Sequence, residues 1–148
     1  MNLRGGLKGI GLVALAALSL GCHRPDRSTM SKAPTLGRAA GTFENSSGFG
    51  QVRPPEFSNG GDPTGHVTNI RWTDWGEPQA VGEGTGFVPA PDGAVADGTF
   101  KPTTVVAFDL GLCDGKLMYR AVEWYYPDLG DKFDPHQYQD ICKGDYVG

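Results

Sequence analysis

The sequence lacks a membrane-length apolar run and an excess of positive charge. Its apolar run at residues 10–20 is shorter than the roughly 20 residues that a helix needs to cross the hydrocarbon core of a bilayer. The formal net charge is −4 and the pI is about 5.2. A nucleic-acid-binding protein would carry a basic face. We therefore expect that this run does not span a membrane and that the protein has no nucleic-acid partner.

Histidines and catalytic motifs are also sparse. His23, His66 and His136 lie far apart in the sequence, which gives little support to a zinc site or a histidine-based catalyst. Gly-x-Ser-x-Gly is absent. The acidic stretch at residues 128–136 lacks the spacing and the closing Glu of a calcium loop, so we interpret it as a solvated loop. We predict no catalytic residue, no metal ligand and no cofactor.

The N-terminal residues of the chain have the pattern of a targeting segment. Arg4 and Lys8 precede the apolar run, and a small residue follows it, which predicts a signal peptide over residues 1–21. Leu18-Ser19-Leu20-Gly21-Cys22 resembles the lipobox of bacterial lipoproteins, except that Ser19 stands where leucine is usual. The resemblance implies that Cys22 becomes the acylated N-terminus. The alternatives are an ordinary secretory signal, which would give a secreted protein, and an uncleaved N-terminal anchor.

The three cysteines fit this interpretation. If Cys22 carries lipid, Cys113 and Cys142 remain as an even pair in an oxidising compartment, which predicts a disulfide between them. The alternative is two free buried cysteines. A disulfide between Cys113 and Cys142 would close a loop of about 30 residues. In the chain-entropy treatment, closing such a loop stabilises the fold by roughly 3–4 kcal/mol.

The composition divides the mature chain into two parts. Residues 22–66 are rich in Gly, Pro and Ser and show no apolar period, so we expect a flexible tether. Phe43, Phe49 and Phe57 are exceptions, and docking of one or two of them would move the domain boundary to near residue 42. We expect residues 67–148 to form a small, disulfide-stapled β domain, with no second domain.

The strongest secondary-structure signal lies at residues 103–127. Two β-branched and aromatic runs flank Asp114-Gly115, a dipeptide typical of a tight β-hairpin. Further strands are predicted over residues 67–75 and 79–88. A short helical turn is predicted to start at Asp134-Pro135 and to reach Cys142. The predicted fold class is mainly β, a small antiparallel sheet or sandwich with one short C-terminal helical turn, preceded by a disordered linker.

Alternation along the strand at residues 79–88 puts three glycines on one face: Gly82, Gly84 and Gly86. We expect an aromatic ring, from Trp72 or Trp75, to pack on this strip. The alternative is that the strip forms the floor of a ligand site.

One stretch supports a resemblance to other proteins. Trp72-Thr-Asp-Trp75-Gly76, continuing to Ala80, Gly82 and Gly84, resembles a Trp-x-x-Trp-Gly-x-x-x-Ala-x-Gly-x-Gly run in small exported proteins and lipoproteins of actinobacteria. The resemblance covers roughly residues 67–127. That group has no assigned activity, so the resemblance implies export and a β fold, and no function.

Aromatic residues are the main candidates for ligand contact. Trp72, Trp75, Tyr125 and Tyr126 suit stacking on sugar rings or burial in a protein partner; the alternative is that they form the core. We therefore expect a lipid-anchored protein on the outer face of the cell membrane that presents a binding domain for an envelope glycan or protein.

Two other functions remain open at this point. One is a small glycan hydrolase using Glu83 and Glu123 as paired carboxylates. The other is a structural surface protein without a defined ligand. The sequence does not predict an oligomeric state.

Overall fold

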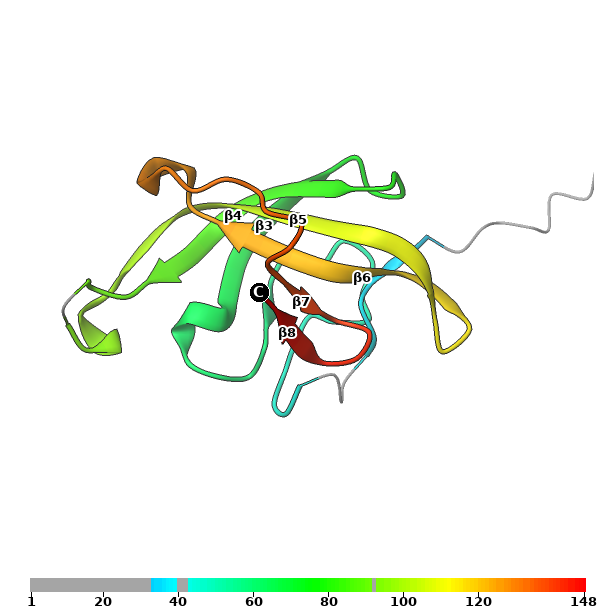
Figure 1. Cartoon of the computed structure of the whole chain (residues 1–148), viewed down its shortest axis with the longest axis horizontal. Helices are drawn as coiled ribbons and strands as arrows, with labels where there is room; N and C mark the ends of the chain where they lie inside the picture. The colour runs from blue at the N-terminus through cyan, green and yellow to red at the C-terminus, as the bar shows by residue number, and fades with distance from the viewer. Residues whose placement is uncertain (1–32, 40–42, 92) are drawn as a thin grey trace, which may run out of the picture. The chain divides into compact units, whose positions relative to one another are not determined.

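Two long strands, β5 (Thr99–Cys113) and β6 (Lys116–Tyr125), form the hairpin at the centre of the fold (Figure 1). The computed structural model describes residues 33–39, 43–91 and 93–148. At the bend, Asp114 and Gly115 have φ values of 50° and 74°. A two-residue turn with both central φ angles positive matches the twist of the flanking strands. The predicted hairpin is confirmed.

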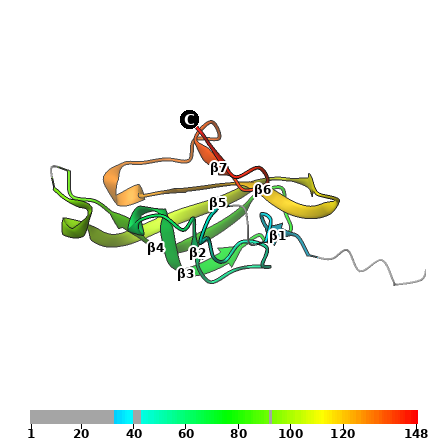
Figure 2. The ribbon, with the colours of Figure 1, turned by 90° about the horizontal axis from the view of Figure 1, so that it is seen from below.

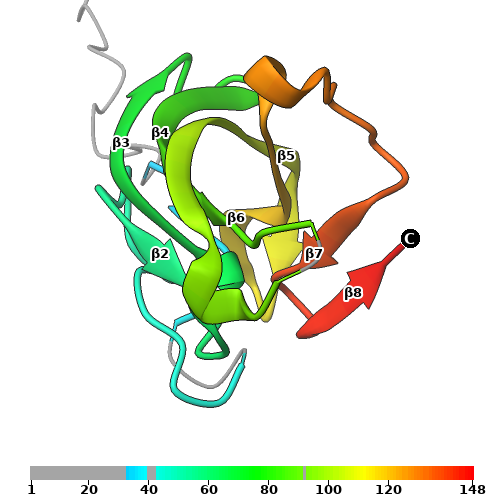
Figure 3. The ribbon, with the colours of Figure 1, turned by 90° about the vertical axis from the view of Figure 1, so that its left-hand side faces the viewer.

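The remaining strands extend this hairpin on both sides in the order β2-β3-β4-β5-β6-β7-β8, and Figure 3 shows the sheet curling round. The short strand β1 pairs in parallel with β6. The predicted mainly β, antiparallel fold class is confirmed. The strands are β1 (Thr35–Leu36), β2 (Phe57–Ser58), β3 (His66–Thr73), β4 (Ala80–Val88), β7 (Tyr138–Asp140) and β8 (Asp145–Val147).

Helical structure in the described residues consists of single 3-10 turns. None of these turns, and no other described segment, is a helix with the length and apolarity required to cross a membrane. The turns are η1 (Pro63–Gly65), η2 (Val95–Asp97) and η3 (Pro127–Leu129).

The core lies between one face of the sheet and the segment that precedes β3. Figure 2 shows β1 and β2 on one side of the central hairpin and β7 on the other. Val105 and Ala107 from β5 and Val122 from β6 are buried on the core face. Leu36, Phe49 and Phe57 pack against them from residues 33–58 and are almost fully buried. The N-terminal segment therefore supplies a large part of the core.

The predicted tether at residues 22–66 is wrong for the residues of that range that the structure describes, 33–39 and 43–66. Its apolar side chains are widely spaced and show no period, yet Leu36, Phe49 and Phe57 are buried in the core and Phe43 packs against it. The backbone is also tied down: Leu36 N–H donates to Gln51 O (2.8 Å), and Gly37 N–H donates to Tyr119 O (2.9 Å). The predicted signal peptide and Cys22 lie outside the described residues.

The glycine strip is packed by side chains, as predicted. A Cβ atom on Gly82 would lie 2.7 Å from Ile70 Cγ2 and 3.0 Å from Trp72 Cε3. A Cβ on Gly86 would lie 2.7 Å from the Tyr126 hydroxyl oxygen. Glycine is therefore needed where these rings approach the strand, and the strip is not an open floor.

The Cys113–Cys142 disulfide is confirmed, with the two Cα atoms 6.0 Å apart. The helical turn predicted from Asp134 to Cys142 is wrong in that place. The Asp134 carboxylate does accept a hydrogen bond from His136 N–H (2.9 Å), but the turn ends there. The chain then forms β7, which pairs with Ala121 and Val122 of β6. The free edge of β6 offers backbone partners to residues 138–140, and these outweigh the local helical signal.

Candidate functional site

A row of polar side chains crosses four strands on the face of the sheet opposite the core. The register pairs Arg71 of β3 with Glu83 of β4, Glu83 with Thr104 of β5, and Thr104 with Tyr125 of β6. Directly paired residues point to the same face. Arg71 and Glu83 are exposed, and Thr104 and Tyr125 are half-buried. We call these four residues the polar row.

Three residues of the polar row line an open groove of about 420 Å³. The other wall comes from η3, which carries Pro127 and Asp128 over the ends of the strands. We call this hollow the polar groove. Its lining residues are Asn69, Arg71, Glu83, Gly84, Thr85, Pro102, Thr103, Thr104, Pro127 and Asp128.

A β-bulge shapes one end of the polar groove. The register between β3 and β4 shifts between Thr68 and Arg71, and Asn69 has a φ of 54°. An extra residue in one strand bends that strand and redirects its side chains. Asn69 lines the polar groove, so the bulge adds an amide to the site.

Alternation in β4 and β5 explains why the groove is polar. Glu83 and Thr85 share a face of β4, whose other face carries the glycines packed by Trp72 and Tyr126. Pro102 pairs with Thr85, and Thr104 pairs with Glu83. The same two strands thus contribute small residues to one face and hydrogen-bonding side chains to the other.

Trp72 and Trp75 do not reach the polar groove. Their rings meet edge to face, with centroids 4.8 Å apart. The Trp72 indole N–H donates to Pro54 O (2.7 Å) and the Trp75 indole N–H donates to Pro34 O (3.0 Å). Both tryptophans therefore fasten the N-terminal segment to the sheet and pack against the core.

The two adjacent tyrosines have different roles. Tyr125 belongs to the polar row. Tyr126 donates its hydroxyl proton to Phe87 O (2.9 Å) and is hydrogen-bonded by the Trp124 side chain. Burial is the main reason why the pKa of Tyr126 is raised. Of the four predicted aromatic contacts, only Tyr125 stands beside the polar groove.

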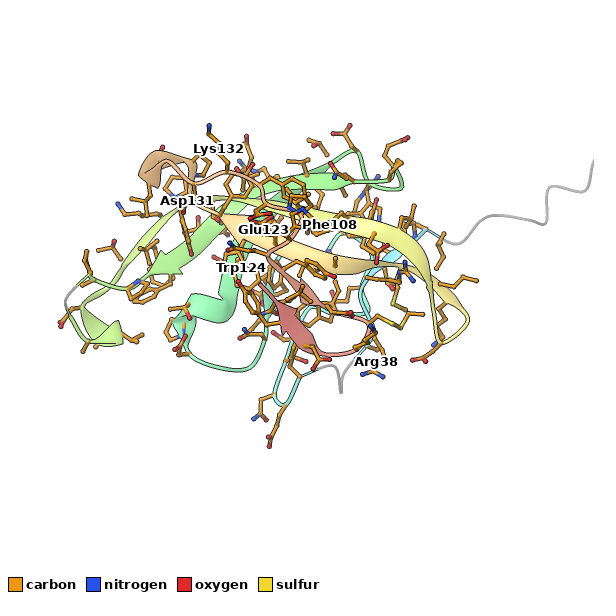
Figure 4. The ribbon with its side chains drawn as sticks, in the orientation of Figure 1. Arg38, Phe108, Glu123, Trp124, Asp131 and Lys132 are labelled. Atoms are coloured by element: carbon orange, nitrogen blue, oxygen red, sulfur yellow. A yellow bond between two sulfur atoms is a disulfide. The ribbon has the colours of Figure 1, made fainter. Side chains whose placement is uncertain are left out.

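Glu83 and Glu123 do not share a site. Glu83 lines the polar groove, whereas Glu123 lines a separate hollow between β6 and β7. Both carboxylate oxygens of Glu123 lie within hydrogen-bonding distance of Asp134 N–H, at 3.1 and 3.0 Å. In Figure 4, Glu123 lies between β6 and the segment that carries Asp131 and Lys132. The two carboxylates therefore line different hollows, not one shared site.

The acidic stretch at residues 128–136 uses its carboxylates on its own backbone. Asp131 accepts from Tyr126 N–H (3.3 Å), and Asp134 accepts from His136 N–H. Across the described ranges, no group of three or more His, Cys, Asp or Glu side chains is placed to hold a metal ion.

Several lining residues of the polar groove were missed in the sequence. The outward positions of Arg71 and Thr104 follow from strand alternation once both strands are paired. Asn69 depends on a bulge and Asp128 on the return of the chain after β6, and neither has a local sequence signal.

Comparison of the chain with known protein families, with curated proteins and with solved structures gave no match in any of the three.

Proposed function

We propose that the protein is a cell-envelope lipoprotein whose domain binds an envelope glycan in the polar groove. The observation that carries this proposal is the polar row: a cation, an anion and a hydroxyl line an open groove, and an aromatic ring pairs with the hydroxyl residue on the neighbouring strand. The size of the groove, about 420 Å³, is within the range of small-molecule sites.

The residue types match what a sugar offers. A sugar ring has an apolar face, which stacks on an aromatic ring such as Tyr125. Its hydroxyls both donate and accept hydrogen bonds. The Arg71 guanidinium only donates, the Glu83 carboxylate only accepts, and the Thr104 hydroxyl does both. Because Arg71 and Glu83 are exposed, their charges remain solvated when the groove is empty.

The anchor is supported by the sequence alone. Cys22 follows a short apolar run and a glycine, and acylation of this cysteine would hold the domain at the membrane. Each buried CH₂ of an acyl chain contributes about 0.8 kcal/mol, so more than one chain is needed for stable anchoring. Mass spectrometry of the membrane fraction tests this. An unmodified N-terminus at or beyond Cys22 would refute the lipoprotein assignment.

Calorimetric titration of the full chain with a soluble N-acetylglucosamine tetramer tests the ligand. Tyr125→Ala and Glu83→Gln are each expected to weaken binding by about tenfold, which corresponds to roughly 1.4 kcal/mol. Two controls match these changes outside the polar groove: Tyr146→Ala, at a tyrosine 65% exposed on β8, and Glu77→Gln, at an exposed glutamate. Absence of binding, or equal losses in the controls, would refute glycan binding in this groove.

A further inference from the structure

The sheet is covered next to one end of the polar groove. Beyond the polar row, the next pair in register on the same face is Val106 of β5 and Glu123 of β6. Val106 is 4% exposed, and the Glu123 carboxylate accepts from Asp134 N–H in the segment between β6 and β7. The same segment places the Phe133 ring against Phe108, with the ring centroids 5.2 Å apart. A ligand in the polar groove therefore meets covered sheet in this direction.

The other end of the polar groove leads to exposed sheet. Thr85 of β4 and Pro102 of β5 are paired, and both line the groove. The next pair on the same face is Phe87 and Phe100, which lies two residues further along each strand, a distance of about 7 Å. Phe100 is 63% exposed. An exposed aromatic side chain therefore stands just beyond this end of the polar groove, on the face that forms its floor.

The Phe100 ring is supported from one side and lies outside the core cluster. It meets the Phe87 ring edge to face, with the centroids 5.3 Å apart and the planes at 75°. Phe87 itself is 8% exposed. Gly98 lies so close to it that a Cβ there would be 2.4 Å from Phe87 Cζ. A ring that is already supported in this way loses little conformational freedom when a ligand stacks on it.

We propose that Phe100 is a second stacking platform for the glycan, and that the ligand is a linear chain of several sugars, not a mono- or disaccharide. Phe100 lies four residues from Thr104 along β5, roughly 13 Å, and Thr104 pairs with Tyr125. One sugar ring is too short to stack on both aromatic rings. A chain laid along β5 would run from Tyr125 past Pro102 to Phe100. This inference rests on the proposed glycan binding in the polar groove.

Calorimetric titration of the full chain with the dimer and the tetramer of N-acetylglucosamine tests this dependence on length. The tetramer is expected to bind at least about tenfold more tightly than the dimer, which corresponds to roughly 1.4 kcal/mol. Phe100→Ala is expected to weaken tetramer binding by about fivefold to tenfold and dimer binding by less than about twofold, because the dimer ends before it reaches Phe100. Equal weakening of the two ligands, or an unchanged affinity for the tetramer, would overturn the proposal.

Two further variants distinguish stacking from general apolar contact. Phe100→Tyr keeps the ring and is expected to keep the tetramer affinity within about twofold. Phe100→Leu keeps an apolar side chain without a ring and is expected to lose most of what Phe100→Ala loses. Tyr146→Ala, at a tyrosine 65% exposed on β8, is the matched control and is expected to change neither affinity. Full affinity in Phe100→Leu, or an equal loss in Tyr146→Ala, would refute stacking at Phe100.

The same titrations separate this inference from the proposed function. If Tyr125→Ala and Glu83→Gln weaken tetramer binding but Phe100→Ala does not, the polar groove still binds glycan and the platform at Phe100 is refuted. If neither the dimer nor the tetramer binds, both are refuted. An NMR titration of the full ¹⁵N-labelled chain gives a second readout: the tetramer is expected to shift the amide signals of residues 87 and 99–101, and the dimer is not. Equal shifts at these residues with both ligands would overturn the proposal.

Discussion

At the scale of single residues, Gly37 shows how closely the N-terminal segment is fitted to the sheet. Its φ is +62°, and a Cβ atom would lie 2.8 Å from Ile141 Cβ. Gly37→Ala should lower the free energy of unfolding by about 2–4 kcal/mol, because a left-handed backbone and an overpacked contact both oppose it. Urea unfolding measures the change.

Gly115 provides the matched control for this prediction. It has a φ of +74°, and a Cβ atom there would meet nothing within 4 Å. Gly115→Ala should therefore lower the free energy of unfolding by about 1–2 kcal/mol, which is the cost of placing alanine in a left-handed backbone conformation. Equal losses at the two positions would show that the contact with Ile141 does not matter.

At the same scale, the carboxyl group of Glu123 predicts how the free energy of unfolding depends on pH. Burial is the main reason why the pKa of its carboxyl is raised above 4.5, and the charge of Asp134 adds to this. Between the unfolded and the folded pKa, the native state binds more protons than the unfolded state. The unfolding free energy contributed by Glu123 therefore falls as pH rises through the folded pKa.

Gln does not titrate, so Glu123→Gln should gain stability relative to the natural chain as pH is raised from about 4 to about 7. Denaturant unfolding of both proteins at the two pH values measures the difference. A difference that stays constant or moves the other way would contradict a raised pKa at Glu123.

At the scale of elements, the two indole groups of β3 and of the turn after it hydrogen-bond the N-terminal segment to the sheet. Trp75 donates to Pro34 O, beside β1. Trp75→Phe removes this donor and leaves a buried carbonyl unpaired, which should cost about 1–3 kcal/mol. We expect faster amide hydrogen exchange at Leu36 and Gly37, whose N–H groups donate to Gln51 O and Tyr119 O.

Trp72→Phe tests whether this effect is local. Trp72 donates to Pro54 O instead, so this variant should destabilise the segment before β2 and leave the exchange of Leu36 and Gly37 closer to that of the natural chain. If the two variants gave the same exchange pattern, the N-terminal segment would open as one unit, and the two indole hydrogen bonds would not act separately.

The elements also divide into those that the sequence predicts and those that it does not. The central hairpin and the strands at residues 67–75 and 79–88 have apolar alternation and turn residues of their own. Strands β1 and β2 contain two residues each, too few to show a period. They exist because distant residues, Tyr119 and Val67, offer paired backbone. The same reason explains β7, where pairing with β6 replaced a predicted helical turn.

The candidate sites follow the same division. Glu83 and Tyr125 were singled out in the sequence, but their alignment in one row depends on the pairing of β4, β5 and β6. Asn69 reaches the polar groove through a bulge, and Asp128 reaches it through the return of the chain after β6. Side chains placed by long-range pairing cannot be read from local patterns.

At the scale of the whole described domain, two distant segments meet along one edge of β6. β1 pairs with Met118 and Tyr119, and β7 pairs with Ala121 and Val122. Between them, Arg38 N–H donates to Ile141 O (3.1 Å) and Ile141 N–H donates to Arg120 O (2.9 Å). The disulfide at Cys142 holds the second segment in place. Both ends of the described chain therefore complete the central hairpin.

This arrangement predicts where the chain can be shortened. A chain that starts at residue 67 lacks Leu36, Phe49 and Phe57, which are between 0% and 6% exposed. Burying three such side chains contributes roughly 5–9 kcal/mol, which is comparable with the whole stability of a small domain. That chain should fail to fold, whereas a chain that starts at residue 33 should show dispersed amide signals and a cooperative thermal transition. Cooperative unfolding of the shorter chain, measured by circular dichroism, would show that the N-terminal segment is dispensable after all.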